Sequence, residues 1–201
     1  PAPFVGAGLP QVAALSGDAK SYAERLFQYP AVGALNSDDA KVAIKQPVED
    51  EGMQITNEAL DEIILKTKGY PYFLQEWGYQ CWNLASGEQI ELLDAAQAAA
   101  DATSRLDEGF FKVRFDRLTP KEREYVIAMA EMGAGPYRSS DVAERLGESH
   151  QSLGPRRAQV ISKGMIYSPS HGDLAFTVPM FHEYLIRHFV KPSMPTRNAP
   201  D

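Results

Sequence analysis

Residues 139–164 read SSDVAERLGESHQSLGPRRAQVISKG, and this stretch decides how the second half of the chain folds. Ala143, Gly147 and Leu153 have the spacing of a helix-turn-helix. Alanine is small where two helices cross closely, glycine adopts the positive φ of a tight turn, and leucine anchors the second helix on the first. The sequence therefore predicts a helix-turn-helix whose second helix covers residues 150–163.

The segments on either side add further elements. Thr119-Pro120-Lys121-Glu122 is a capping box with proline at the first helical position, so a helix begins there. After Gly164, apolar stretches at 165–167 and 174–177 flank a polar tip and predict a β-hairpin. Pro179 is expected to begin a last helix. Helix, helix, helix, hairpin and helix is the order of a winged helix, with the hairpin as its wing.

The second helix of this motif carries side chains that suit a DNA groove. Arginine pairs with guanine or phosphate, glutamine pairs with adenine, and His171 or Ser170 on the wing suits a minor groove. The expected contacts with double-stranded DNA are Gln151, Ser152, Arg156, Arg157, Gln159, Lys163 and His171. Gly154-Pro155 leaves two geometries open, because the proline either lies in the first turn of a helix that starts near Ser152 or kinks a longer helix. A winged helix that docks on protein and never meets DNA is the alternative.

Charge divides the chain into two unlike parts. Of its 201 residues, those from 1 to 111 hold 7 Lys and Arg against 17 Asp and Glu, whereas those from 112 to 191 hold 12 against 9. The net charge of -7 therefore combines an acidic part at -10 with a basic part at +3. This asymmetry predicts two small domains with different partners.

Composition excludes some classes of protein and indicates a compartment. The apolar runs are too short to cross a bilayer, so a membrane protein is not expected. The first residues carry neither a basic region nor a sustained apolar core, so no secretory signal is expected there. Cys81 is the only cysteine, which excludes an intramolecular disulfide and favours the reducing cytoplasm.

The acidic part is expected to be helical. Apolar residues at helical spacing predict a helix over 11–26, which is followed by a brief extended piece at 27–29. Asn36 or Ser37 can cap the next helix, and Pro47 is expected to end it or to start another. Thr56 then caps a helix that ends before Gly69.

The most distinctive sequence of the acidic part is Gly69-Tyr70-Pro71-Tyr72-Phe73-Leu74-Gln75. Pro71 fits the first position of a helix, because its missing N–H costs nothing there. The N–H groups of such a helix start can receive an anion, and Tyr70 or Tyr72 could stack on a purine. The alternative is a plain helix start whose aromatic side chains fill the core.

No catalytic or metal-binding constellation is predicted. Gly17-Asp18-Ala19-Lys20-Ser21 resembles the end of a phosphate-binding loop but lacks its second glycine and its spacing. The four histidines of the chain show no metal-ligand spacing with cysteine or carboxylate partners.

Taken in order, four segments resemble the C-terminal portion of bacterial and archaeal AAA-type ATPases, close to the signal-transducing (STAND) and origin-recognition-like branches. The matching segments are Gly6-Ala7-Gly8-Leu9-Pro10, Ala23-Glu24-Arg25-Leu26-Phe27-x-Tyr29, Gly69 to Gln75, and Phe115-Asp116-Arg117-Leu118-Thr119-Pro120. The resemblance implies a mostly α chain with the end of an ATPase core (last strands and a helix) at 1–30 and a helical lid domain at 31–111. It also implies a winged-helix domain at 112–191, followed by a disordered tail at 192–201.

The resemblance also implies roles for particular residues. Tyr70, Pro71 and Tyr72 would border the adenosine, and Arg25 would approach phosphate or a neighbouring subunit of a homo-oligomer. The chain departs from the family, because Pro3 to Gly8 hold no polar sensor residue and no arginine follows Gly69 in the lid helix. It also lacks the phosphate-binding loop and the Mg-binding acidic strand of the family. ATP and Mg would therefore belong to a core outside this chain, which alone is expected to be inactive and to bind ATP weakly or not at all.

Overall fold

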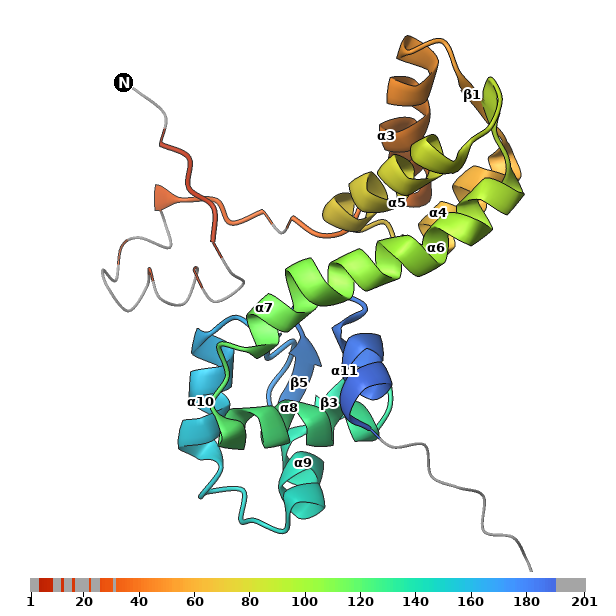
Figure 1. Cartoon of the computed structure of the whole chain (residues 1–201). Coiled ribbons are helices and arrows are strands. Elements are labelled where there is room, and N and C mark those ends of the chain that lie inside the picture. The colour runs from red at the N-terminus through yellow and green to blue at the C-terminus, as the bar shows by residue number, and fades with distance from the viewer. Residues whose placement is uncertain are drawn as a thin grey trace, which may run out of the picture. The chain divides into compact units, whose positions relative to one another are not determined.

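The computed structural model describes residues 4–8, 12, 16, 22, 26–30 and 32–190. The chain forms two compact units, with the boundary between Val113 and Arg114. The described part is mostly helical, with one short pair of parallel strands and one small antiparallel sheet (Figure 1). The fold is therefore mostly α, as the sequence predicts. Among the described helices, none has the length and apolar character that crossing a bilayer requires.

Four helices form the described core of unit 1, the residues up to Val113: α3 (Ser37–Asp50), α4 (Asn57–Thr67), α5 (Pro71–Leu84) and α6 (Leu92–Leu106). Two short strands, β1 (Gln54–Ile55) and β2 (Gln89–Ile90), pair in parallel. The largest side chains of this core include Phe73, Leu74, Trp77, Leu60 and Ile63, each at most 1% exposed. The apolar stripes of α4 and α5 thus meet inside the unit, as their helical spacing predicts.

The helix starts of unit 1 follow the capping residues of the sequence. Asn36 accepts a hydrogen bond from the backbone N–H of Asp39, and Thr56 accepts one from that of Ala59. Pro47 contradicts the prediction, because α3 runs through it to Asp50. A proline inside a helix removes one hydrogen bond, and here buried side chains on both sides of it, Ile44 and Val48, hold the helix together.

The first thirty residues are described only in part. The expected helix over 11–26, including Arg25, lies mostly outside the described residues. Residues 4–8 and 27–30 are described and are irregular, so the last strands that the resemblance implies for residues 1–30 do not form in these two segments. A strand needs a neighbour for its hydrogen-bond ladder, and in the described part of unit 1 the strands β1 and β2 pair with each other.

A π-helical turn that the sequence did not predict follows α6. It covers Asp107–Phe111 and is followed by α7 (Lys112–Phe115). The boundary between the two units falls within α7. Phe110 is 8% exposed and Phe111 is fully buried. The wider turn places two consecutive aromatic side chains in the core, which the regular α-helical period would separate by about 100°.

Unit 2, which begins at Arg114, contains four principal helices: α8 (Pro120–Glu131), α9 (Ser139–Leu146), α10 (Gly154–Ser162) and α11 (Phe181–Phe189). Three strands accompany them: β3 (Tyr137–Arg138), β4 (Ile166–Tyr167) and β5 (Asp173–Phe176). Their order in the sheet is β3-β5-β4, with both pairs antiparallel. β4 and β5 form the predicted hairpin, and Ile166 lies opposite Phe176.

Two helix starts in unit 2 differ from the prediction. α10 begins at Gly154, so Pro155 lies in its first turn and Gln151 and Ser152 lie in the turn before the helix. A proline at this position costs no hydrogen bond, which explains why the helix begins there and is not kinked at it. α11 begins at Phe181, two residues after Pro179.

Candidate functional site

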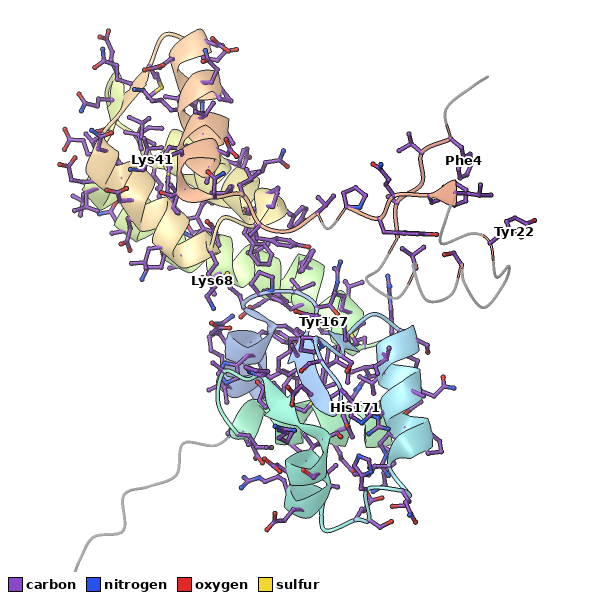
Figure 2. The ribbon with its side chains drawn as sticks, turned by 180° about the vertical axis from the view of Figure 1, so that it is seen from behind. Phe4, Tyr22, Lys41, Lys68, Tyr167 and His171 are labelled. Carbon is purple, nitrogen blue, oxygen red and sulfur yellow. The ribbon has the colours of Figure 1, made fainter. Side chains whose placement is uncertain are left out.

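The start of α5 is fixed by two successive residues with positive φ. Lys68 ends α4 with φ 53°, and Gly69 follows with φ 70°. Figure 2 labels Lys68 at this end of α4. The carbonyl oxygen of Gly69 accepts a hydrogen bond from the backbone N–H of Leu35 at 2.9 Å. A methyl group on Gly69 would overlap the carbonyl oxygen of Leu35, so this close approach requires glycine.

The aromatic side chains at this helix start form one cluster. The Tyr70 ring lies 4.7 Å from that of Phe73, and the Tyr72 ring stacks on Phe110 at 4.9 Å with an interplanar angle of 24°. Phe73 and Phe111 are fully buried at the centre of the cluster, whereas Tyr72 is 49% exposed. The structure thus brings together Tyr70, Pro71 and Tyr72, whereas the fourth residue of the expected nucleotide-facing set, Arg25, lies outside the described residues.

Cys81, on α5, is buried and unsuited to nucleophilic chemistry. Its side chain is fully buried, and this burial raises the pKa of its thiol to about 12. The reactive form of cysteine is the thiolate, so at neutral pH this residue is a core side chain.

The turn between α9 and α10 has the features that the sequence predicts. Gly147 ends α9 in the left-handed conformation, with φ 65°. Ala143 is 3% exposed and Leu153 is 2% exposed. The small residue and the leucine therefore lie in the core of unit 2, and glycine occupies the turn.

Two of the predicted DNA contacts form ion pairs within unit 2. The Arg156 guanidinium contacts both carboxylate oxygens of Glu148, at 2.9 and 3.2 Å, and its side chain is only 17% exposed. The Lys163 ammonium lies 2.6 Å from a carboxylate oxygen of Glu122 and donates to the carbonyl oxygen of Arg117 at 2.9 Å. Both cations thus already have acceptors, and binding a phosphate would replace contacts that they already make.

Glu122 is the buried partner in the second of these pairs. Burial alone would raise the pKa of its carboxyl group. Hydrogen bonds from Lys163 and Thr119, together with the charge of Lys163, hold the pKa of Glu122 below its usual value. The capping box that starts α8 is therefore linked to the end of α10 by a charged contact.

Arg157 contacts a histidine instead of a carboxylate. Its guanidinium lies 2.9 Å from Nε2 of His150, and the hydroxyl of Ser139 lies 2.9 Å from the same nitrogen. A guanidinium only donates hydrogen bonds, so Nε2 of His150 must be the acceptor and carries no proton in this arrangement. Arg157 therefore gains no ionic partner from this contact.

The outward face of α10 carries no charge. Its exposed residues are Pro155, Ala158, Gln159 and Ser162. Of the remaining predicted contacts, Gln151 and Ser152 are exposed in the turn before α10, and His171 is exposed at the hairpin tip (Figure 2). Gln159 is thus the predicted DNA contact among the exposed residues of α10, and Arg157 is half-buried at the side of this face.

Arg138 is a candidate that the sequence analysis missed. It lies in β3, its side chain is 68% exposed, and its Nε is 3.3 Å from Asp173 at the start of β5. This places a cation next to the hairpin that carries His171. A two-residue strand has no recognisable periodicity, so no local pattern indicates that Arg138 lies beside the hairpin.

The described residues contain no group of three histidine, cysteine or acidic side chains that could hold a metal ion.

A comparison with known families matches residues 108–185 to a domain of unknown function (DUF8462). This match extends from the π-helical turn into α11. No curated protein matches the chain significantly.

Proposed function

We propose that this chain is the lid and winged-helix region of an AAA/STAND-type P-loop ATPase, in which ATP binding by a core outside the chain is coupled to a DNA-binding winged helix. The cytoplasm is the proposed compartment, and ATP with Mg the proposed cofactors of the parent protein. Within unit 1, residues 1–30 would be the end of the ATPase core and residues 31–111 the lid, and unit 2 would be the winged helix.

The strand order β3-β5-β4 is the observation that carries this proposal. β3 lies between α8 and α9 in sequence, yet it pairs with the second strand of the hairpin. The hairpin is thereby attached to the segment that precedes α9 and is not left as a separate loop, which supports the proposal of a winged helix. The exposed ring of Tyr72 beside the Pro71 helix start supports the nucleotide-facing role of unit 1.

DNA binding is tested with the full chain and a fluorescently labelled duplex of about 20 base pairs, by anisotropy at several salt concentrations. Replacing Arg157 with alanine is expected to weaken binding about fivefold and to lower the salt slope by about 1. Lys121→Ala is the matched control, because it removes one charge from an exposed side chain of α8 outside the proposed interface. Equal effects of the two substitutions would reject α10 as the DNA-facing helix.

A second function is favoured by the charge of the α10 face. The ion pairs of Arg156 and Lys163 leave an outward surface of Pro155, Ala158 and Gln159 that is neutral and suits contact with protein. In this alternative the winged helix is an interaction or autoinhibitory module that docks on the ATPase core or on a partner. Hydrogen exchange in the full-length parent distinguishes the two, because docking on protein would slow exchange in α10 without DNA.

The nucleotide role of this chain is tested separately by calorimetry with ATP and Mg. Because the phosphate-binding loop is proposed to lie in the core, titration of residues 1–201 should give weak heat or none. Tight binding of ATP to this chain would contradict the assignment of unit 1 as a lid alone.

A further inference from the structure

An apolar groove lies on unit 1 between α3 and α5. Its volume is about 280 Å³, and Ala43 and Pro47 from α3 face Gly78, Tyr79 and Trp82 from α5. Gly78 lets the Ile44 side chain approach α5 closely, since a methyl group on Gly78 would lie 3.2 Å from it. Tyr79 is 55% exposed and Trp82 is 38% exposed, so two aromatic rings form an accessible wall. The groove suits an inserted apolar side chain.

The groove ends at a strongly acidic part of unit 1. α3 leads into β1 and α5 leads into β2, and these strands pair in parallel, so the C-terminal ends of the two helices lie at the same end of the unit (Figure 1). Exposed carboxylates gather at this end: Glu49, Asp50, Glu51 and Glu88. Neither helix has a basic residue in its last turn. Glu49 pairs with Lys45 at 3.5 Å, and Asp50 accepts a hydrogen bond from the side-chain amide of Gln46. A helix C-terminus is itself negative, so the two helix ends together with Glu51 and Glu88 attract a further cation.

Two further observations connect this charge to the groove. Glu51 lines the groove together with Trp82. Pro47 has no N–H, so the carbonyl oxygen of Ala43, another groove residue, cannot receive the hydrogen bond that position 47 would normally donate. The groove thus combines an apolar wall with acceptors for a donor-rich partner. The cation of Arg105, on α6, lies 5.5 Å from the centre of the Tyr79 ring, and its charge is paired with Glu76 at 3.7 Å.

We infer that this groove docks a cationic amphipathic helix of a partner protein. An apolar side chain of the partner rests between Pro47 and the rings of Tyr79 and Trp82, and a lysine or arginine one turn away contacts Glu51. This site is separate from the proposed nucleotide-facing cluster and does not depend on the function proposed for either unit.

The test measures binding of a fluorescein-labelled helical peptide of about 14 residues, with leucine on one face and lysine on the other, to the full chain. A second peptide carries glutamate in place of each lysine. The lysine peptide is expected to bind, with an affinity that falls as salt rises, whereas the glutamate peptide is expected to bind at least about tenfold more weakly. Equal binding of the two peptides would overturn the proposal.

Matched variants locate the site. Trp82→Ala should weaken binding of the lysine peptide about tenfold, while Leu84→Ala, an equally exposed residue outside the groove lining, should change it less than about twofold. Tyr79→Ala serves the same purpose if Trp82→Ala impairs folding. Glu51→Lys should weaken binding of the lysine peptide and flatten its salt dependence. Asp101→Lys makes the same change in net charge at an exposed position of α6 and should leave both the affinity and the salt dependence unchanged.

Two outcomes would reject the partner helix. One is unchanged peptide affinity in both Trp82→Ala and Tyr79→Ala. The other is a dimer of the chain, detected by light scattering at the concentration used, that Trp82→Ala converts to a monomer, because a second copy would then occupy the groove.

Discussion

Gly69→Ala is the substitution whose effect on unit 1 can be worked out most directly from the structure. Gly69 has φ 70°, and the position of a Cβ atom there is taken by the carbonyl oxygen of Leu35. The same pair of residues shares a backbone hydrogen bond of 2.9 Å. Alanine at this position must therefore adopt a left-handed conformation and also push the segment around Leu35 away.

Two costs add up in this variant. The left-handed conformation of a residue other than glycine costs about 1 kcal/mol. Moving Leu35 away breaks its hydrogen bond and loosens the contact, which costs about 1–2 kcal/mol more. We expect the free energy of unfolding of unit 1 to fall by about 2–3 kcal/mol. With a urea dependence of about 1.5 kcal/mol per M, the unfolding midpoint falls by about 1.3–2 M.

Tryptophan fluorescence measures this change in unit 1 alone, because both tryptophans of the chain, Trp77 and Trp82, lie on α5. Gly52→Ala is the matched control in the same unit. Its φ is 79°, but open space surrounds the position of its Cβ atom, so only the conformational cost of about 1 kcal/mol applies. If the two variants unfold at the same urea concentration, the approach of Leu35 to Gly69 contributes nothing and the reasoning is wrong.

Two other predictions concern ionisable groups. Lys163→Met removes the cation that lowers the pKa of Glu122 in the folded state. The stabilisation that comes from this lowered pKa is present at pH values above the pKa of Glu122 in the unfolded chain, and it is lost as the pH falls through the pKa of Glu122 in the folded chain. At pH 7 the free energy of unfolding of unit 2 should fall by about 1–3 kcal/mol in this variant, and on acidification the unit should unfold at a higher pH than in the unsubstituted chain. Methyl NMR of the buried Met129 follows this unfolding. An unchanged acid midpoint would show that the ion pair does not stabilise the unit. Because the pKa of Cys81 is about 12, its thiol should react with iodoacetamide at pH 8 only when urea unfolds unit 1, and rapid labelling of the folded chain, measured by mass spectrometry, would contradict its burial.

The sequence predicted those elements whose signals are local. A cap such as Asn36 or Thr56, a proline at a helix start such as Pro71, and a glycine after a helix such as Gly147 each act within a few residues. β1, β2 and β3 are two residues long, so they show no periodicity and form only because tertiary packing brings them together. The helix through Pro47 has the same cause, since burial of its neighbours outweighs the local preference.

Candidate site residues were harder to predict than the helices that carry them. The sequence placed Arg156 and Lys163 correctly on or next to α10, but not the acids that each would meet. Glu148 lies eight residues before Arg156, across a turn, and Glu122 lies on another helix. Such pairings depend on the packing of whole helices, which no spacing within α10 reveals.

These pairings change what the basic charge of unit 2 means for DNA binding. A cation that must first leave a carboxylate gains little net free energy when it contacts a phosphate, and the pair that Arg156 forms with Glu148 is partly buried. Arg157 donates to a histidine, and the pair of Arg138 with Asp173 is weak because the Arg138 side chain is 68% exposed. Both arginines can therefore turn to a phosphate at a lower cost. Two such contacts give a salt slope of about −2, whereas phosphate contacts by all four cations would give about −3.6. A measured slope near −2 therefore means that the ion pairs of α10 persist on DNA, and a steeper slope means that DNA opens them.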